Sequence, residues 1–131
     1  MTWKLFIDDD RDPHVTVDDA AWRRNAGLPD LPPEACSALG EWVVARTVAE
    51  AIDRIRERGV PAFVSFDHDL GPGTETGMDL AKAIVEMDLD DPCIPDGFAF
   101  EVHSANPVGR RNILHLLDNY LGFRAAEARP R

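Results

Sequence analysis

Residues 62–69 read AFVSFDHD, an apolar run that changes abruptly into charged side chains. A short apolar run bounded in this way is typical of a buried β-strand. The same pattern occurs at residues 3–10 (WKLFIDDD) and at residues 98–104 (FAFEVHS). A further run, WVVA at residues 42–45, leads into less reactive side chains. The sequence therefore predicts four strands, three of which end in reactive polar groups.

Segments with helical periodicity alternate with these strands. Apolar residues recur at helical spacing in residues 48–55, 78–85 and 113–121. We expect the second of these helices to stop before Asp88, and the tail from Arg124 to be frayed or to form a short edge element. Alternating strands and helices imply a mostly parallel sheet with helices on both faces. The predicted fold class is an α/β three-layer sandwich with four or five strands, and the 131 residues suit a single domain, 1–131.

Residues 12–40 interrupt this alternation. Only Val17–Ala26 has a helical pattern there, with Asp18 or Asp19 placed at its N-terminus. Prolines break the segment Leu28–Gly40, which we expect to be a loop. Residues 12–40 are therefore interpreted as an irregular insertion, either a lid over the site or a scaffold.

The charge balance narrows the range of partners. The chain has 24 acidic and 14 basic residues, a net charge of −10. Such a field repels the phosphates of duplex DNA, so duplex DNA is not an expected partner. A phosphorylated small molecule or an RNA end is compatible with this charge if a local basic patch holds it. The residues available for that patch are Arg11, Arg46, Arg110 and Arg111.

The sequence predicts no membrane association and a cytoplasmic location. The apolar run at the N-terminus is too short for a signal peptide, and no stretch approaches the roughly 20 apolar residues of a membrane span. Cys36 and Cys93 lack the spacing of a zinc site or redox motif. We expect them to be idle thiols in a reducing compartment, with a bridge between them as the alternative. A homodimer is compatible with the sequence.

Acidic side chains follow two of the strands, at the edge of the sheet where parallel α/β folds bind ligands. Carboxylates brought close together repel one another by several kcal/mol at an effective dielectric of about 20, unless a cation neutralises them. Hard oxygen ligands suit Mg²⁺ or Mn²⁺. The predicted metal ligands are Asp8, Asp9, Asp67 and Asp69. The alternative is that these aspartates only cap helices or brace loops.

Two histidines follow strand ends as well. Either His68 or His103 alone would more often be a packed or solvated residue, but as a pair at one edge they are candidates for acid–base catalysis or metal binding. The predicted catalytic residues are Asp67, His68, His103 and Ser104.

The segment SANP at residues 104–107 predicts the start of a helix, whose backbone amides form a natural anion site. Arginines one turn into that helix can reach a phosphate oxygen. The alternative is that Ser104 or Asn106 only caps the helix and the arginines are solvated. The predicted substrate-binding residues are Asn106, Arg110, Arg111 and Arg11.

The residues at the strand ends resemble those of the receiver domains of response regulators. The resemblance implies that Asp8 and Asp9 hold Mg²⁺, that Asp67 accepts phosphate and that Ser104 contacts the phosphate. A receiver also has a fifth strand that carries a lysine, and nothing after Leu121 supplies one.

The segments IDDDR (7–11), DHDLG (67–71) and HSANP (103–107) are more similar to a divergent branch, the cyclic-phosphate processing receiver-like domains. The likeness covers most of the chain except residues 12–40. It implies a receiver-like (flavodoxin-like) fold and an activity on cyclic phosphate ends of RNA.

Two functions follow from these patterns. The first is a metal-dependent phosphoesterase that acts on a cyclic phosphate or on an RNA or nucleotide phosphate end. The alternative is a non-enzymatic phosphoacceptor switch or anion-binding interaction module. The added histidines and the missing lysine favour the enzyme. A carboxylate enzyme that cuts nucleic acid fits the acids but has little basic surface.

Overall fold

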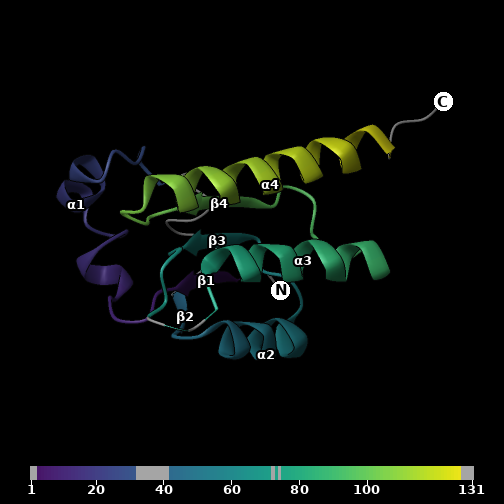
Figure 1. Cartoon of the computed structure of the whole chain (residues 1–131), viewed down its shortest axis with the longest axis horizontal. Helices are drawn as coiled ribbons and strands as arrows, with labels where there is room; N and C mark the ends of the chain where they lie inside the picture. The colour runs from purple at the N-terminus through teal and green to yellow at the C-terminus, as the bar shows by residue number, and fades with distance from the viewer. Residues whose placement is uncertain (1–2, 32–41, 72, 74, 128–131) are drawn as a thin grey trace.

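The computed structural model describes residues 3–31, 42–71, 73 and 75–127. Its four strands are β1 (Lys4–Ile7), β2 (Trp42–Ala45), β3 (Phe63–Phe66) and β4 (Ala99–Val102). They form one sheet in the order β2-β1-β3-β4, and every neighbouring pair is parallel (Figure 1). The predicted parallel α/β sheet is confirmed, with four strands in the described part of the chain.

Three helices cover one face of the sheet: α2 (Val48–Arg58), α3 (Gly77–Asp90) and α4 (Pro107–Glu127) (Figure 1). Alternate residues of the central strands point toward them, because successive side chains of a strand face opposite sides. The resulting core is fully apolar and contains Leu5, Ile7, Val64, Phe66, Ile55, Leu80, Ile84, Ile113 and Leu117.

The described part of the insertion, residues 12–31, packs against the other face of the sheet. It holds a short 3₁₀ helix, η1 (Pro13–Val15), and α1 (Ala20–Asn25), which lies at the end of the sheet where α4 begins (Figure 1). Arg23 of α1 reaches Glu101 of β4, and both side chains are buried. The three layers that the sequence predicts are therefore present, with α1 and its flanking residues as the third.

Two predicted helix boundaries were wrong. The helix predicted over Val17–Ala26 spans only Ala20–Asn25, although Asp19 is at its N-terminus as predicted and caps it by accepting a hydrogen bond from the backbone N–H of Trp22. The helix expected to stop before Asp88 continues to Asp90. The buried Asp88 carboxylate accepts hydrogen bonds from the backbone N–H groups of Cys93 and Ile94, so this residue fastens the chain that leaves the helix.

The C-terminal tail was also predicted differently. Instead of fraying from Arg124, α4 continues to Glu127. The Arg124 guanidinium lies 3.0 Å from the Asp88 carboxylate, and the Tyr120 hydroxyl donates to the same carboxylate at 2.6 Å. These contacts hold the last turns of α4 against α3.

Some predictions fall outside the described residues. Cys36 and residues 32–40 of the predicted loop belong to that part. In the described part, the Cys93 thiol is free and exposed. None of the described helices has the length and apolar character that crossing a membrane requires.

Candidate functional site

The strand register brings three predicted site residues into one row. The backbone N–H of Asp67 donates to Ile7 at 3.0 Å, and that of His103 donates to Phe66 at 2.8 Å. Asp8, Asp67 and His103 therefore follow β1, β3 and β4 at the same level of the sheet. We call these three residues the acidic row. All three are buried, and one ligand atom from each lies within 4.8 Å of the others. Two carboxylates and an imidazole in this arrangement can hold a metal ion.

Asp8 is the most strongly hydrogen-bonded member of this row. Its Oδ1 accepts from the backbone N–H groups of Asp10 and Arg11, and its Oδ2 lies 2.9 Å from Arg11 Nε and 3.1 Å from His103 Nε2. Burial alone would raise the pKa of Asp8, but the hydrogen bond with His103, the two backbone bonds and the Arg11 charge lower it to about 2. Asp8 is thus a carboxylate at neutral pH.

Asp67 has the opposite electrostatic character. Burial and the neighbouring Asp8 charge raise its pKa above the usual value, against the lowering effects of His103, Arg11 and the Ser104 hydroxyl. Arg11 Nη2 lies 3.4 Å from the Asp67 carboxylate. The cation that the paired acids were expected to need is therefore supplied in part by Arg11 itself. The pKa of Asp67 is still raised, mainly by burial, so Arg11 offsets only part of the cost of burying this carboxylate.

The low pKa of Asp8 predicts a specific acid sensitivity. A carboxyl whose pKa is lowered by folding stabilises the native state above its unfolded pKa, and this contribution is lost as pH falls toward the folded value. For Asp8 the contribution is about 2 kcal/mol, lost between about pH 4 and pH 2. The raised pKa of Asp67 acts in the opposite direction, so a comparison of variants is needed.

Urea unfolding of the wild type and Asp8→Asn at several pH values isolates this contribution. The difference in unfolding free energy between the two proteins is expected to shrink as pH falls from about 5 to about 2. A difference that stays constant over this range would show that Asp8 has an ordinary pKa.

His103 is held from three sides. Its ring stacks on Phe6 with centroids 4.6 Å apart, and the indole of Trp22 meets it edge-on at 6.4 Å. Its Nδ1 lies 2.8 Å from Ser65 Oγ, which in turn lies 2.9 Å from Glu101 Oε2. Since an ionised glutamate only accepts hydrogen bonds, the Ser65 hydroxyl donates to Glu101, and its oxygen accepts a hydrogen bond from the Nδ1–H of His103. Nε2 is the ring nitrogen that faces the two aspartates.

Sequence reasoning missed Ser65, Glu101, Arg23 and Trp22 as parts of this site. The one sign of them in the sequence was Glu101, an acidic residue inside the apolar run FAFEV at residues 98–102. A buried carboxylate in a strand needs a partner, but the sequence alone does not say that the partner is Arg23, from a different segment. That contact is a bidentate pair, with distances of 3.0 and 2.7 Å.

Other predicted site residues form a separate, more exposed group. His68 Nδ1 lies 2.8 Å from Asp69, whose two carboxylate oxygens also accept from Asn106 Nδ2 at 3.4 and 3.3 Å. The hydrogen bond from His68 lowers the pKa of Asp69. Asp9 is exposed, and neither Asp9 nor Asp69 belongs to the buried row of Asp8, Asp67 and His103. Their assignment as metal ligands stays a prediction.

The helix-capping alternative applies to Asn106. Its Oδ1 accepts from the backbone N–H of Gly109 at 3.0 Å and so caps α4. Ser104 Oγ accepts from the backbone N–H of Asn106 at 3.1 Å and also hydrogen-bonds to Asp67. Ser104 thus joins the start of α4 to the acidic row. Arg46, from the predicted basic patch, binds the backbone oxygens of Asp8 and Arg11 instead.

Two glycines allow the close approach of the elements around Asp67. A Cβ on Gly77 would lie 2.0 Å from the backbone oxygen of Asp67, and a Cβ on Gly109 would lie 2.3 Å from Cγ of His68. At Gly77 the clash is with the backbone of Asp67, which cannot turn aside as a side chain can. The start of α3 therefore requires glycine where it passes Asp67, whereas the neighbour of Gly109 is the His68 ring.

Gly77→Ala is accordingly expected to lower the free energy of unfolding by about 1–3 kcal/mol, because the backbone at Asp67 must shift. The control is Gly122→Ala in α4, where a Cβ has nothing within 4 Å. In that exposed helical position alanine is expected to stabilise by about 0.5–1 kcal/mol. Urea unfolding measures both. Equal effects of the two substitutions would contradict the close approach at Gly77.

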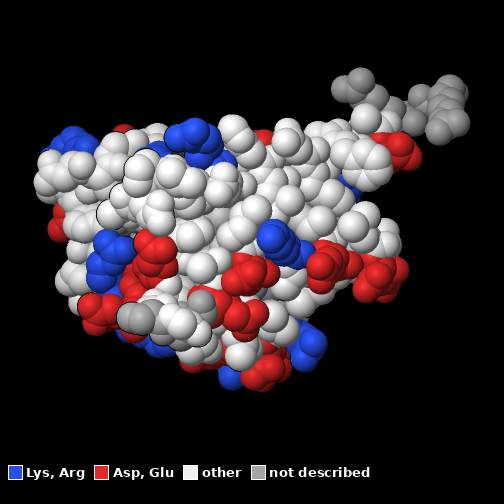
Figure 2. Space-filling view, viewed as in Figure 1, with Lys and Arg blue, Asp and Glu red and all other residues white. Residues whose placement is uncertain are grey.

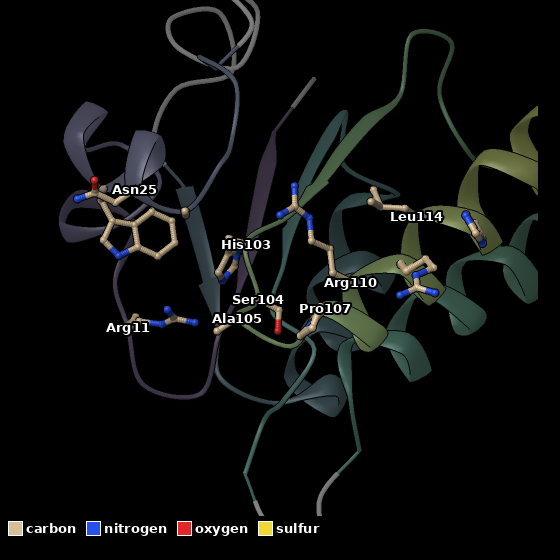
Figure 3. A pocket seen from close by; sticks show the side chains of 12 residues that line it. Arg11, Asn25, His103, Ser104, Ala105, Pro107, Arg110 and Leu114 are labelled. Atoms are coloured by element: carbon tan, nitrogen blue, oxygen red, sulfur yellow. The ribbon is translucent and has the colours of Figure 1, made fainter.

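A pocket of about 530 Å³ opens beside the acidic row. Arg11 and Asn25 stand on one side of it, Arg110 and Leu114 on the other, and His103 and Ser104 lie between them (Figure 3). The full lining is Arg11, Trp22, Asn25, Ala26, His103, Ser104, Ala105, Pro107, Arg110, Arg111, Leu114 and His115.

The charge of this lining differs from that of the whole chain. It contains three arginines and no aspartate or glutamate, whereas the chain has a net charge of −10. Figure 2 shows acidic side chains over α2 and α3 and also near the end of the sheet where α4 begins. A pocket with this lining attracts an anion. Of the predicted substrate-binding residues, Arg11, Arg110 and Arg111 line it, whereas Asn106 does not.

The chain was compared with curated proteins and with solved structures. No curated protein matches the chain significantly. A solved N-terminal domain of a response regulator/sensory box/GGDEF 3-domain protein from Carboxydothermus hydrogenoformans is 16% identical, covers 96% of this chain and 99% of its own, and has a TM-score of 0.42. A fusion that carries the yeast Spc42 trimeric coiled coil is 14% identical over 97% of this chain and 83% of its own, with a TM-score of 0.41.

The family comparison covers nearly the whole described chain. Residues 3–119 match the model of the cyclic-phosphate processing receiver domain, a span that includes all four strands, the acidic row and the start of α4. The resemblance found in the strand-end segments is thereby confirmed. The chain belongs to the cyclic-phosphate processing receiver domain family.

Proposed function

We propose that this protein is a metal-dependent phosphoesterase that opens a cyclic phosphate on a nucleotide or at an RNA end. The name of its family indicates a role in cyclic-phosphate processing. The observation that carries the proposal is the juxtaposition of Asp8, Asp67 and His103 at the edge of a pocket lined by arginines. Buried carboxylates next to an anion-attracting pocket are what a metal-assisted reaction on a phosphate ester requires.

The residues of the row fit a divalent cation. Two carboxylates and one imidazole suit Mn²⁺, and Mg²⁺ if water completes its coordination. His103 would bind through Nε2, with the ring fixed by the hydrogen bond from Nδ1 to Ser65 and beyond it by Glu101. A cation so bound polarises a phosphoryl oxygen and lowers the pKa of water. The closeness of Asp67 to Asp8 supports this assignment, because a cation relieves the repulsion between the two carboxylates.

The other predicted site residues would act from outside the row. Arg110 and Arg111 line the pocket and would hold the non-reacting phosphate oxygens. His68 is oriented by Asp69 in the arrangement of an acid–base residue and its orienting partner, and we assign proton transfer to the leaving oxygen to it. Water adds to phosphorus, one of the two ring ester bonds breaks, and the product is a phosphomonoester with a free hydroxyl.

The test is ³¹P NMR of a 2′,3′-cyclic nucleotide incubated with the protein and Mg²⁺ or Mn²⁺. Conversion of the cyclic phosphate signal to that of a phosphomonoester is expected, and a chelator is expected to stop it. The position of the product phosphate shows which ester bond breaks. Turnover that persists in excess chelator, or no turnover with either metal, would sink the proposal.

One observation favours the phosphoacceptor switch as a second candidate. Arg11 Nη2 lies 3.4 Å from the Asp67 carboxylate and would pair with a phosphoryl group there. Phosphate on Asp67 would act as a local electrostatic switch. Incubation with a small acyl-phosphate donor and Mg²⁺, followed by mass spectrometry, decides this. A mass increase that Asp67→Asn abolishes would establish the switch.

A further inference from the structure

We propose that the pocket beside the acidic row is a nucleoside-binding subsite, in which Trp22 and Asn25 of α1 receive the base attached to the phosphate. This inference deepens the proposed function and rests on it for the position of the phosphate. It assigns a role to α1 and to residues that neither the strand-end motifs nor the acidic row includes.

The size of the pocket is the first observation. Its volume of about 530 Å³ lies within the range of roughly 300–1,000 Å³ that is typical of sites for drug-sized ligands. A phosphate group alone fills a small part of such a space. Ser104, Arg110 and Arg111 are enough to hold the phosphate. The part of the pocket near α1 is then left for another portion of the ligand.

The chemistry of the α1 side is the second observation. Trp22, Asn25 and Ala26 form this wall and none of them carries a charge. The half-buried Trp22 ring is held in place, because the Arg11 guanidinium lies 5.6 Å from its centroid and His103 meets it edge-on. A fixed indole provides a stacking surface for a planar base. The Asn25 amide carries both donors and an acceptor, which matches the polar edge of a base.

The anchoring of α1 is the third observation. Arg23, the residue after Trp22, pairs with Glu101 in the sheet and also donates to the backbone oxygens of Val17 and Pro29. This buried contact fixes α1 against β4, the strand that leads to His103 and Ser104. The stacking wall is thus built into the folded protein, and the insertion acts as a wall of the site.

The proposal is tested by calorimetry on the chain of residues 1–131 in excess chelator, so that no turnover is needed. The probes are adenosine 3′-monophosphate and inorganic phosphate. The wild type is expected to bind the nucleotide at least about tenfold more tightly than inorganic phosphate, since base–aromatic stacking contributes about that factor or more. Trp22→Ala is expected to remove most of this preference and to leave the affinity for inorganic phosphate unchanged.

Two further variants separate stacking from a folding defect. Trp22→Phe keeps an aromatic ring and is expected to retain most of the preference. Phe123→Ala removes an exposed aromatic residue of α4 that does not line the pocket, and it is expected to change neither affinity.

An oligoribonucleotide with a 3′-phosphate distinguishes the two sources of the nucleoside. Competition with the mononucleotide indicates an RNA end, and lack of competition indicates a free nucleotide. Both results support the subsite.

Equal affinity of the wild type for nucleotide and inorganic phosphate would overturn the inference, as would a nucleotide affinity that Trp22→Ala leaves unchanged. Because the binding assay contains no metal, it is independent of the reaction. If the cyclic nucleotide is not opened but the nucleotide preference is present and depends on Trp22, the phosphoesterase proposal fails and the subsite stands.

Discussion

Arg23→Ala is expected to lower the free energy of unfolding by about 3–5 kcal/mol, the usual effect of removing one partner of a buried ion pair. Arg23 and Glu101 have side chains only 5% and 10% exposed, and their nearest charged atoms are 2.7 Å apart. The substitution leaves the Glu101 carboxylate buried without its cation. It also removes hydrogen bonds to the backbone oxygens of Val17 and Pro29, which no other side chain in the described part of the chain is seen to replace.

Arg24→Ala is the matched control. Arg24 is the next residue of α1, it is exposed, and its loss is expected to change stability by no more than about 0.5 kcal/mol. Urea unfolding followed by circular dichroism measures both variants. The double variant Arg23→Met/Glu101→Met removes the pair together and is expected to be more stable than Arg23→Ala, because no unpaired charge stays buried. Similar losses for Arg23→Ala and Arg24→Ala would show that the ion pair does not hold the insertion to the sheet.

The sheet could be predicted from the sequence because its strands carry their own signal. Each central strand is a short apolar run that ends in charged residues, and the helices between them have a clear apolar stripe. The ends of α3 and α4 were mispredicted for one shared reason. Asp88 looks like a helix-breaking surface acid in sequence, but its carboxylate is buried by contacts from α4 and from the turn after α3. Contacts between segments that are distant in the sequence cannot be predicted from the local pattern of apolar and polar residues.

The acidic row could be predicted only in part from the sequence. Because the carboxyl ends of parallel strands meet at one edge, the sequence brings Asp8, Asp67 and His103 together without any structure. It does not separate them from Asp9 and Asp69, since the direction of a loop side chain depends on hydrogen bonds such as that of Asn106 with Asp69. It also does not show where the insertion packs, since that depends on contacts between distant segments, such as Arg23 with Glu101 and Trp22 with His103.

Asp67→Asn is expected to lower kcat/KM for metal-dependent opening of a cyclic phosphate by about a thousandfold or more. Under the proposed function, Asp67 is a ligand of the cation, and charge stabilisation by a bound cation is worth several kcal/mol in the transition state. The amide has the same shape as the carboxylate but no charge, so the fold is expected to survive. Its effect on stability is expected to be small or favourable, since burial and the Asp8 charge disfavour the ionised form of Asp67.

Asp10→Asn is the control for that experiment, because it removes the same charge from the neighbouring loop. The Asp10 side chain is exposed, and its contact with the row is the bond from its backbone N–H to Asp8, which the substitution keeps. The control is expected to retain kcat/KM within about threefold, because the charge that is lost is exposed and screened by solvent. Rates are followed by ³¹P NMR at saturating Mn²⁺, and metal affinity by calorimetry. A reaction that Asp67→Asn leaves intact would place the metal elsewhere. If Asp67→Asn abolishes turnover but not metal binding, Asp67 acts on the substrate and Asp8 and His103 hold the cation.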